Sequence, residues 1–129
     1  MILDTSVIID VLRGADGVSE WEAELDESGS AAVTPISVME LWEGVHRSTA
    51  SERERERVET LLTGLTEVPF GRSAAMRAGK LSAELSAAGT PIEVEDLMIA
   101  AIAIENGEAV LTGNAAHFER IAGLTVETY

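Results

Sequence analysis

The sequence predicts an α/β domain built on a mostly parallel central sheet. Short apolar runs suited to buried strands alternate with longer segments of helical periodicity, the order expected of βα units. The chain has 129 residues, the length of one domain, so we expect a single domain over residues 1–129. Hydrophobic residues make up 46% of the chain but aromatic residues only 4%, which predicts an aliphatic core.

Five short runs are expected to form the strands. They are Met1–Leu3, Ala31–Thr34, Glu67–Pro69, Ala109–Thr112 and Leu124–Val126. Pro69 falls at the end of its run, where a missing N–H is tolerated.

Helices are expected between these runs. Ser6 is the predicted cap of a helix from Val7 to Arg13 that ends at Gly14. The segment Ser37–Glu40 has the pattern of a capping box that opens a helix toward Arg47. Further helices are expected over residues 19–27, 50–63, 71–88 and 93–106, and glycines at 64, 89 and 107 end the last three.

The chain is strongly acidic. Its net charge is −14, from 23 acidic and 9 basic residues, and Lys80 is its one lysine. Such a charge repels nucleic acid and acidic membranes. Two interpretations stay open: the acidity is functional, or it is the surface of a protein living in high salt, where screening weakens repulsion. Abundant Glu with a single lysine favours the second.

Several classes are excluded or disfavoured by composition. The chain has no cysteine, which excludes disulfides, thiolate metal sites and a cysteine nucleophile. It lacks the pattern of a signal peptide, and no apolar run approaches the ~18 residues of a membrane span, so we expect a cytoplasmic protein without a membrane partner. The alternating Glu and Arg of residues 52–57 have helical pair spacing, which favours a self-paired surface over an RNA-binding row.

Four polar residues are the candidates for chemistry. Asp4 ends the first strand, Glu40 and Asp96 are expected in the first turns of their helices, and Asn114 follows the strand over 109–112. In a parallel sheet these positions share one edge, where ligands bind. Carboxylates that converge there repel one another unless a hard cation such as Mg²⁺ or Mn²⁺ lies between them.

A purely structural interpretation stays open for two of these acids. Glu40 is also placed to close the capping box with Ser37, and Asp96 is one of three acids, with Glu93 and Glu95, that suit the positive end of a helix dipole. Asp4 is harder to explain in this way, because it precedes the predicted helix.

The order of motifs resembles one family. The motifs are Asp4-Thr5-Ser6, Glu40-Leu41-Trp42-Glu43-Gly44, Asp96-Leu97-Met98-Ile99-Ala100-Ala101, Leu111-Thr112-Gly113-Asn114 and the run from His117 to Leu124. Together they resemble PIN-domain ribonucleases, and most of all the VapC toxins of toxin–antitoxin pairs. Each motif is weak alone, but five in order over the whole length are specific.

This resemblance implies a three-layer α/β/α PIN-like domain that cleaves RNA with Mg²⁺, or with Mn²⁺. Asp4, Glu40 and Asp96 match the family's metal-site acids, and we take Asp4 and Asp96 as the metal ligands. Thr5, Ser6 and Thr112 match hydroxyl positions around that site. Many relatives carry a fourth acid where this chain has Asn114, which supplies no charge, so a tight second metal site is in doubt. By analogy, a metal-activated water attacks the phosphodiester, which requires no nucleophilic side chain.

The resemblance also implies partners: a cognate antitoxin that neutralises the toxin, and a second copy of the chain in a homodimer. Two rivals remain. One is a receiver or haloacid-dehalogenase-like phosphotransferase, which also places Asp after its first strand. That class usually needs a lysine after a late strand, whereas Lys80 lies mid-helix. The other is a non-catalytic PIN-like binding module, which Mg²⁺ would not stabilise.

Overall fold

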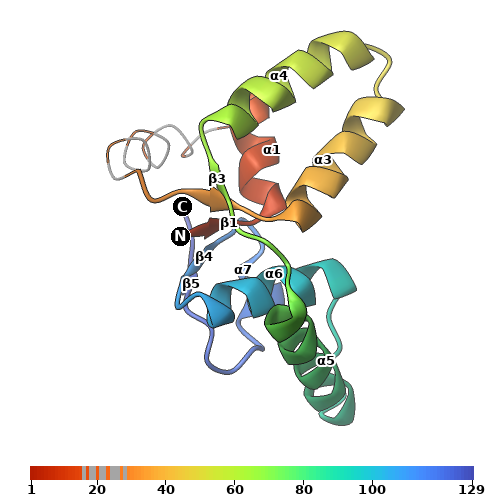
Figure 1. The fold of residues 1–129 in the computed structure, drawn as a ribbon, viewed down its shortest axis with the longest axis vertical. Coiled ribbons are helices and arrows are strands. Elements are labelled where there is room, and N and C mark those ends of the chain that lie inside the picture. Colours follow the sequence, from red (N-terminus) through yellow and green to blue (C-terminus); the bar gives the residue numbers. More distant parts are fainter. Residues whose placement is uncertain (16, 18–19, 21–22, 24–26, 28) are drawn as a thin grey trace.

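Five short parallel strands form the centre of the molecule (Figure 1). The computed structural model describes residues 1–15, 17, 20, 23, 27 and 29–129. The strands are β1 (Ile2–Leu3), β2 (Ala32–Val33), β3 (Thr66–Glu67), β4 (Val110–Leu111) and β5 (Val126–Glu127). Their order is β3-β2-β1-β4-β5, and all four neighbouring pairs are parallel. The predicted fold class is confirmed.

The two faces of the sheet are covered by different side chains. Ile2 pairs with Ala32 and Val110, and all three belong to one core cluster. The next residue along each strand, Leu3, Val33 and Leu111, belongs to the other cluster. Successive side chains of a strand point to opposite faces, so β1, β2 and β4 each supply one apolar residue to each layer. Both faces of these three central strands are buried, which explains their apolar runs in the sequence.

Helices cover the two faces as separate layers, α1, α3 and α4 on one and α5, α6 and α7 on the other (Figure 1). Their bounds are α1 Thr5–Arg13, α3 Pro35–Arg47, α4 Ser51–Thr63, α5 Arg72–Ala87, α6 Val94–Glu105 and α7 Ala115–Phe118. Residues 99–103 of α6 have no exposed surface, because α6 lies between the sheet and α5. The three-layer α/β/α arrangement is therefore confirmed.

Two predicted helix starts are wrong, and in both cases the helix begins earlier. Asp4, not Ser6, is the N-cap of α1, and it has an extended backbone with φ −66° and ψ 153°. Thr34, not Ser37, is the N-cap of α3: its hydroxyl accepts the Ser37 N–H, and proline at the first helical position favours this start. There is consequently no Ser37–Glu40 capping box, and Glu40 lies in the second turn.

The remaining helix ends agree with the sequence to within one or two residues. Gly14 ends α1 in the left-handed conformation, with φ 65°, which glycine adopts without strain. The four-residue helix α7 was not predicted, and the predicted helix over 19–27 lies outside the fully described residues. Two of the expected pairs in α4 form, Glu52–Arg55 and Glu54–Arg57.

The strand order differs from that of a receiver domain, one of the two phosphotransferase-like alternatives. A receiver domain has the order 2-1-3-4-5, whereas this sheet places β1 in the centre and β3 at an edge.

Searched over the described residues, the chain has no helix long and apolar enough to cross a membrane.

Candidate active site at the carboxyl ends of the strands

Asp4 lies at the centre of the site, where β1 passes into α1. Its backbone N–H donates to Leu111 of β4, so the sheet itself fixes its position. The side chain is 5% exposed and accepts three hydrogen bonds. Oδ1 accepts from the Thr5 N–H at 2.9 Å, while Oδ2 accepts from the hydroxyls of Ser6 at 2.7 Å and Thr112 at 2.8 Å. Hydrogen bonds to an ionised carboxylate are stronger than hydrogen bonds between neutral groups, so the three bonds hold the buried Asp4 carboxylate in one orientation.

The loop after β4 is tied to α1 by the same hydroxyls. Ser6 Oγ accepts the Gly113 N–H at 3.1 Å, and Thr112 Oγ1 accepts the Asn114 N–H at 2.9 Å. Both hydroxyls therefore accept from the loop and donate to Asp4. A Cβ at Gly113 would lie 3.0 Å from the Tyr129 hydroxyl, so the loop approaches the C-terminal residue closely.

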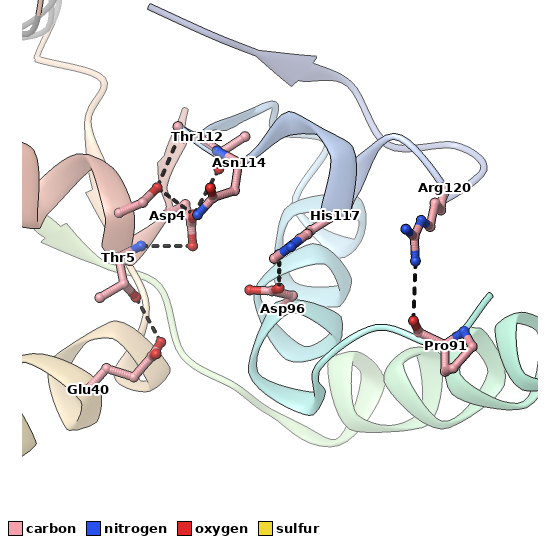
Figure 2. A network of polar contacts seen from close by, with 11 residues as sticks. Asp4, Thr5, Glu40, Pro91, Asp96, Thr112, Asn114, His117 and Arg120 are labelled. Atoms are coloured by element: carbon pink, nitrogen blue, oxygen red, sulfur yellow. Dashed lines mark hydrogen bonds and ion pairs between the residues drawn. The ribbon is translucent and has the colours of Figure 1, made fainter.

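Glu40 is connected to Asp4 through Thr5. The Thr5 hydroxyl donates to Glu40 Oε1 at 2.8 Å (Figure 2). The same hydroxyl lies 2.8 Å from the Ser37 hydroxyl. A hydroxyl has one proton to donate, and Thr5 gives it to the carboxylate, so Ser37 must donate to Thr5. Ser37 thus supports the site from inside α3, in place of the capping role predicted for it.

Asp96 enters the site from the first turn of α6. Its Oδ2 lies 3.0 Å from Nδ1 of His117, a residue of α7, and Figure 2 shows the two side chains pointing toward each other. The Asp96 side chain is 17% exposed and that of His117 50%. This contact joins α6 to α7 through two residues that are 21 positions apart in the chain.

These residues line one open pocket of about 280 Å³. Its lining consists of Asp4, Thr5, Ser6, Ile9, Glu40, Glu93, Glu95, Asp96, Asn114 and His117. Burial raises the pKa of Glu40, and the charges of Asp4, Glu95 and Asp96 add to this, against the lowering effect of the Thr5 hydrogen bond. Burial also raises the pKa of Asp96, followed by the charge of Asp4, while His117 acts in the opposite direction. The pocket therefore gathers acidic side chains closely enough that the negative charge of Asp4 opposes the ionisation of both Glu40 and Asp96.

The oxygen donors suit a hard cation. The lining offers carboxylate, hydroxyl and amide oxygens, which match Mg²⁺, Mn²⁺ and Ca²⁺ better than softer metals. In the part of the chain that the structure describes, no group of three or more Asp, Glu, His or Cys side chains is placed to hold a metal ion together. Mg²⁺ does not need one, because it is usually held by one or two carboxylates and keeps several waters.

The sequence predicted most of the residues that meet at this pocket. Six of the seven predicted residues line the pocket, and the seventh, Thr112, lies behind it as a hydrogen-bond donor to Asp4. It missed the contact of His117 with Asp96 and the supporting role of Ser37. The one available indication for His117 was its position three residues after Asn114.

The fold and the pocket define a class: a parallel α/β domain with an acidic pocket at the carboxyl ends of its strands. Comparison with known proteins narrows this class. Residues 1–124 match the family model described as PIN domain. The sequence is 33% identical over 128 residues to the tRNA(fMet)-specific endonuclease VapC of Salmonella typhimurium, covering 99% of this chain and 96% of that protein. It is 32% identical over 130 residues to ribonuclease VapC2 of Haemophilus influenzae, with 99% and 96% covered.

Solved structures agree with these relatives. The fold is similar to that of a chain in the DNA-bound VapBC complex of Salmonella typhimurium, with a TM-score of 0.91, 32% identity, and 98% and 96% of the two chains covered. It is also similar to a chain in VapBC2 of Rickettsia felis bound to a promoter DNA fragment, with a TM-score of 0.92, 26% identity, and 99% and 97% covered. The chain belongs to the PIN-domain family, as a VapC-type ribonuclease.

Proposed function

We propose that this chain is a Mg²⁺-dependent endoribonuclease toxin that a cognate antitoxin neutralises. The observation that carries the proposal is the convergence of Asp4, Glu40 and Asp96 on one pocket, where burial raises the pKa of Glu40 and of Asp96. We further propose a homodimer, on the family resemblance alone. We also propose that the protein acts in the cytoplasm, where its RNA target is found.

Asp4 and Asp96 are the proposed metal ligands. Hydrogen bonds orient Asp4, and the bond from His117 engages only Oδ2 of Asp96, which leaves Oδ1 free of protein partners among the described residues. Mn²⁺ would suit the same oxygens. A bound Mg²⁺ supplies Lewis-acid polarisation of the phosphoryl group and lowers the pKa of its water.

Glu40 is the proposed general base. Its Oε1 accepts from Thr5, so Oε2 is available to take the proton of the attacking water. Burial raises the pKa of Glu40, which makes its carboxylate a stronger proton acceptor. Asn114, at the mouth of the pocket, adds an uncharged amide that can hydrogen-bond a phosphate oxygen without adding repulsion.

A larger groove beside the pocket is the proposed antitoxin site. It has a volume of about 550 Å³, lies between α1, α3 and α4, and shares Ile9 and Glu40 with the acidic pocket. The lining includes Leu12, Leu41 and Val45. An apolar segment lying there would reach the edge of the acidic pocket. The solved relatives described as VapBC complexes support such a partner.

The groove can be tested at Gly44, which lines it. Gly44 is exposed, and a Cβ built on it meets no atom within 4 Å, so a side chain added here starts in open space. We expect Gly44→Trp to keep RNA cleavage but to escape inhibition by the co-expressed antitoxin, while the control Gly44→Ala stays inhibited. Full inhibition of Gly44→Trp would contradict this location.

The activity itself is tested with purified chain and RNA. The Salmonella relative is a tRNA(fMet)-specific endonuclease, so tRNA(fMet) is the first substrate to test, beside total RNA. We expect cleavage in Mg²⁺, and none in EDTA or by Asp4→Asn. A matched control is Glu84→Gln, which removes one exposed carboxylate of α5 outside the pocket. Cleavage that survives EDTA, or survives both Asp4→Asn and Asp96→Asn, would overturn the proposal.

A further inference from the structure

A second, smaller hollow continues from the acidic pocket. It has a volume of about 140 Å³ and is lined by Pro91, Ile92, Glu93, His117 and Arg120. Glu93 and His117 also line the acidic pocket, so the two hollows share a wall. A chain that lies in the acidic pocket and continues past His117 therefore enters this hollow next.

Arg120 brings a positive charge to this hollow. It follows α7 and is exposed, and its Nη1 lies 3.4 Å from the carbonyl oxygen of Pro91 (Figure 2). Its guanidinium forms no ion pair with any carboxylate of the described residues. A guanidinium has five N–H donors, and this one long contact engages a single one. Within the described residues, Arg120 is thus a cation without a carboxylate partner, and most of its N–H donors are unused.

An unpaired arginine matters in this protein because its surroundings are acidic. The net charge is −14, and five acids line the active-site pocket. Four arginines are paired with a nearby carboxylate, such as Arg55 with Glu52 and Arg77 with Glu105. Arg120 is the arginine that lines the hollow next to the acidic pocket, and it is not paired in this way within the described residues. A polyanion that approaches the pocket is repelled unless a cation stands beside it.

We propose that this hollow binds a phosphodiester group of the RNA next to the one that is cleaved, with Arg120 as its ligand. The proposal rests on the proposed ribonuclease function and deepens it. Ligand pockets for whole small molecules measure about 300–1,000 Å³, so a hollow of about 140 Å³ fits a single group rather than a nucleotide. The fork of an arginine matches two phosphate oxygens at once. Glu93 lies in the same hollow and opposes the anion, which limits the affinity.

The test compares Arg120→Gln with the unchanged protein in RNA cleavage and in RNA binding. We expect KM to rise about tenfold with kcat within about twofold, because a phosphate contact to a bound chain outside the cleaved bond stabilises ground and transition states alike. In the Asp4→Asn background, anisotropy of a labelled RNA should give a Kd about tenfold weaker, by the same factor for different RNA sequences, and a salt slope smaller by about one. Glu93→Gln should change Kd in the opposite direction.

The matched control is Arg53→Gln. Arg53 lies on α4, is exposed, and likewise forms no ion pair within the described residues, but it is on the opposite face of the sheet. Arg53→Gln removes the same charge as Arg120→Gln, but far from the hollow. The Kd of this variant for RNA should therefore stay within about twofold of that of the unchanged protein. Equal effects of Arg120→Gln and Arg53→Gln, or a loss in kcat without a change in KM, would overturn the inference.

The inference and the proposed function fail in different ways. If the unchanged protein cleaves RNA but Arg120→Gln binds it normally, the hollow is not a phosphate site although the ribonuclease proposal stands. If the unchanged protein cleaves nothing in Mg²⁺, the ribonuclease proposal fails whatever the binding result. Arg120→Lys is a second variant that keeps the charge, and we expect it to restore part of the affinity.

Discussion

The substitution Asp96→Asn tests metal binding without weakening the fold. The amide has nearly the same size as the carboxylate and keeps a side-chain oxygen that can accept the hydrogen bond from His117. What it removes is a half-buried charge that the charge of Asp4 opposes. Without divalent cation, we therefore expect Asp96→Asn to melt at the same temperature as the unchanged protein or higher.

In Mg²⁺ we expect the opposite: the unchanged protein should melt at a higher temperature than Asp96→Asn. A cation that binds only the folded state, present at ten times its Kd, stabilises it by about 1.4 kcal/mol. For 129 residues, an unfolding entropy of about 2.1 cal/mol/K per residue amounts to about 0.27 kcal/mol/K. The melting temperature of the unchanged protein should then rise by about 5 °C. Asp96→Asn lacks one of the two proposed ligands, so its rise should be below about 1 °C at the same concentration.

The assay is thermal unfolding followed by circular dichroism, with and without Mg²⁺ and at constant ionic strength. Glu84→Gln, which removes a carboxylate outside the pocket, should show the full rise. The reasoning is refuted if Asp96→Asn keeps the full rise, or if the unchanged protein shows none.

Three further predictions concern the residues that hold the site. Phe118→Ala should lower the free energy of unfolding by about 3–5 kcal/mol in urea titration, because Phe118 is fully buried; a loss below about 1 kcal/mol would contradict its core position. Thr34→Ala should cost about 1 kcal/mol, since Thr34 caps α3 through the Ser37 N–H, and a neutral result would argue against that start. Gly113→Ala should lower the melting temperature through its contact with the Tyr129 hydroxyl, and Tyr129→Phe should relieve part of that loss; strictly additive effects would disprove the contact.

The positions of Asp4 and Asp96 were predictable because each depends on a local pattern. Asp4 follows an apolar strand directly, and Asp96 opens a helix that is apolar all round and so must be buried. Alternation of strands and helices then implies a parallel sheet, whose carboxyl ends meet at one edge. These rules hold without knowledge of any particular tertiary contact.

The helix starts were not predictable by the same rules. Asp4, Thr5 and Ser6 are consecutive residues whose side chains can all cap a helix, as can Thr34 near Ser37. Which one does so depends on where the strand leaves the sheet, and Asp4 is fixed by its backbone bond to Leu111 in β4. A sequence pattern has no access to that bond.

The contact between Asp96 and His117 and the hollow beside Arg120 depend on how α7 packs against α6. Helix α7 is only four residues long, too short for a periodic pattern. Phe118 is fully buried in the cluster that includes α6, which turns His117 toward the pocket. Placement of this kind follows from tertiary packing, so the sequence indicated only that His117 is near Asn114.

The central claim is that the acidic pocket makes water, rather than a group of the protein or the RNA, attack the phosphodiester. Cleavage in ¹⁸O-labelled water, with mass analysis of the product ends, tests this most directly. The account predicts labelled oxygen in the terminal phosphate when the unchanged protein cuts RNA in Mg²⁺, and no labelled product with Asp4→Asn. A cyclic phosphate without label would show that the 2′-hydroxyl of the RNA attacks, and would contradict the account.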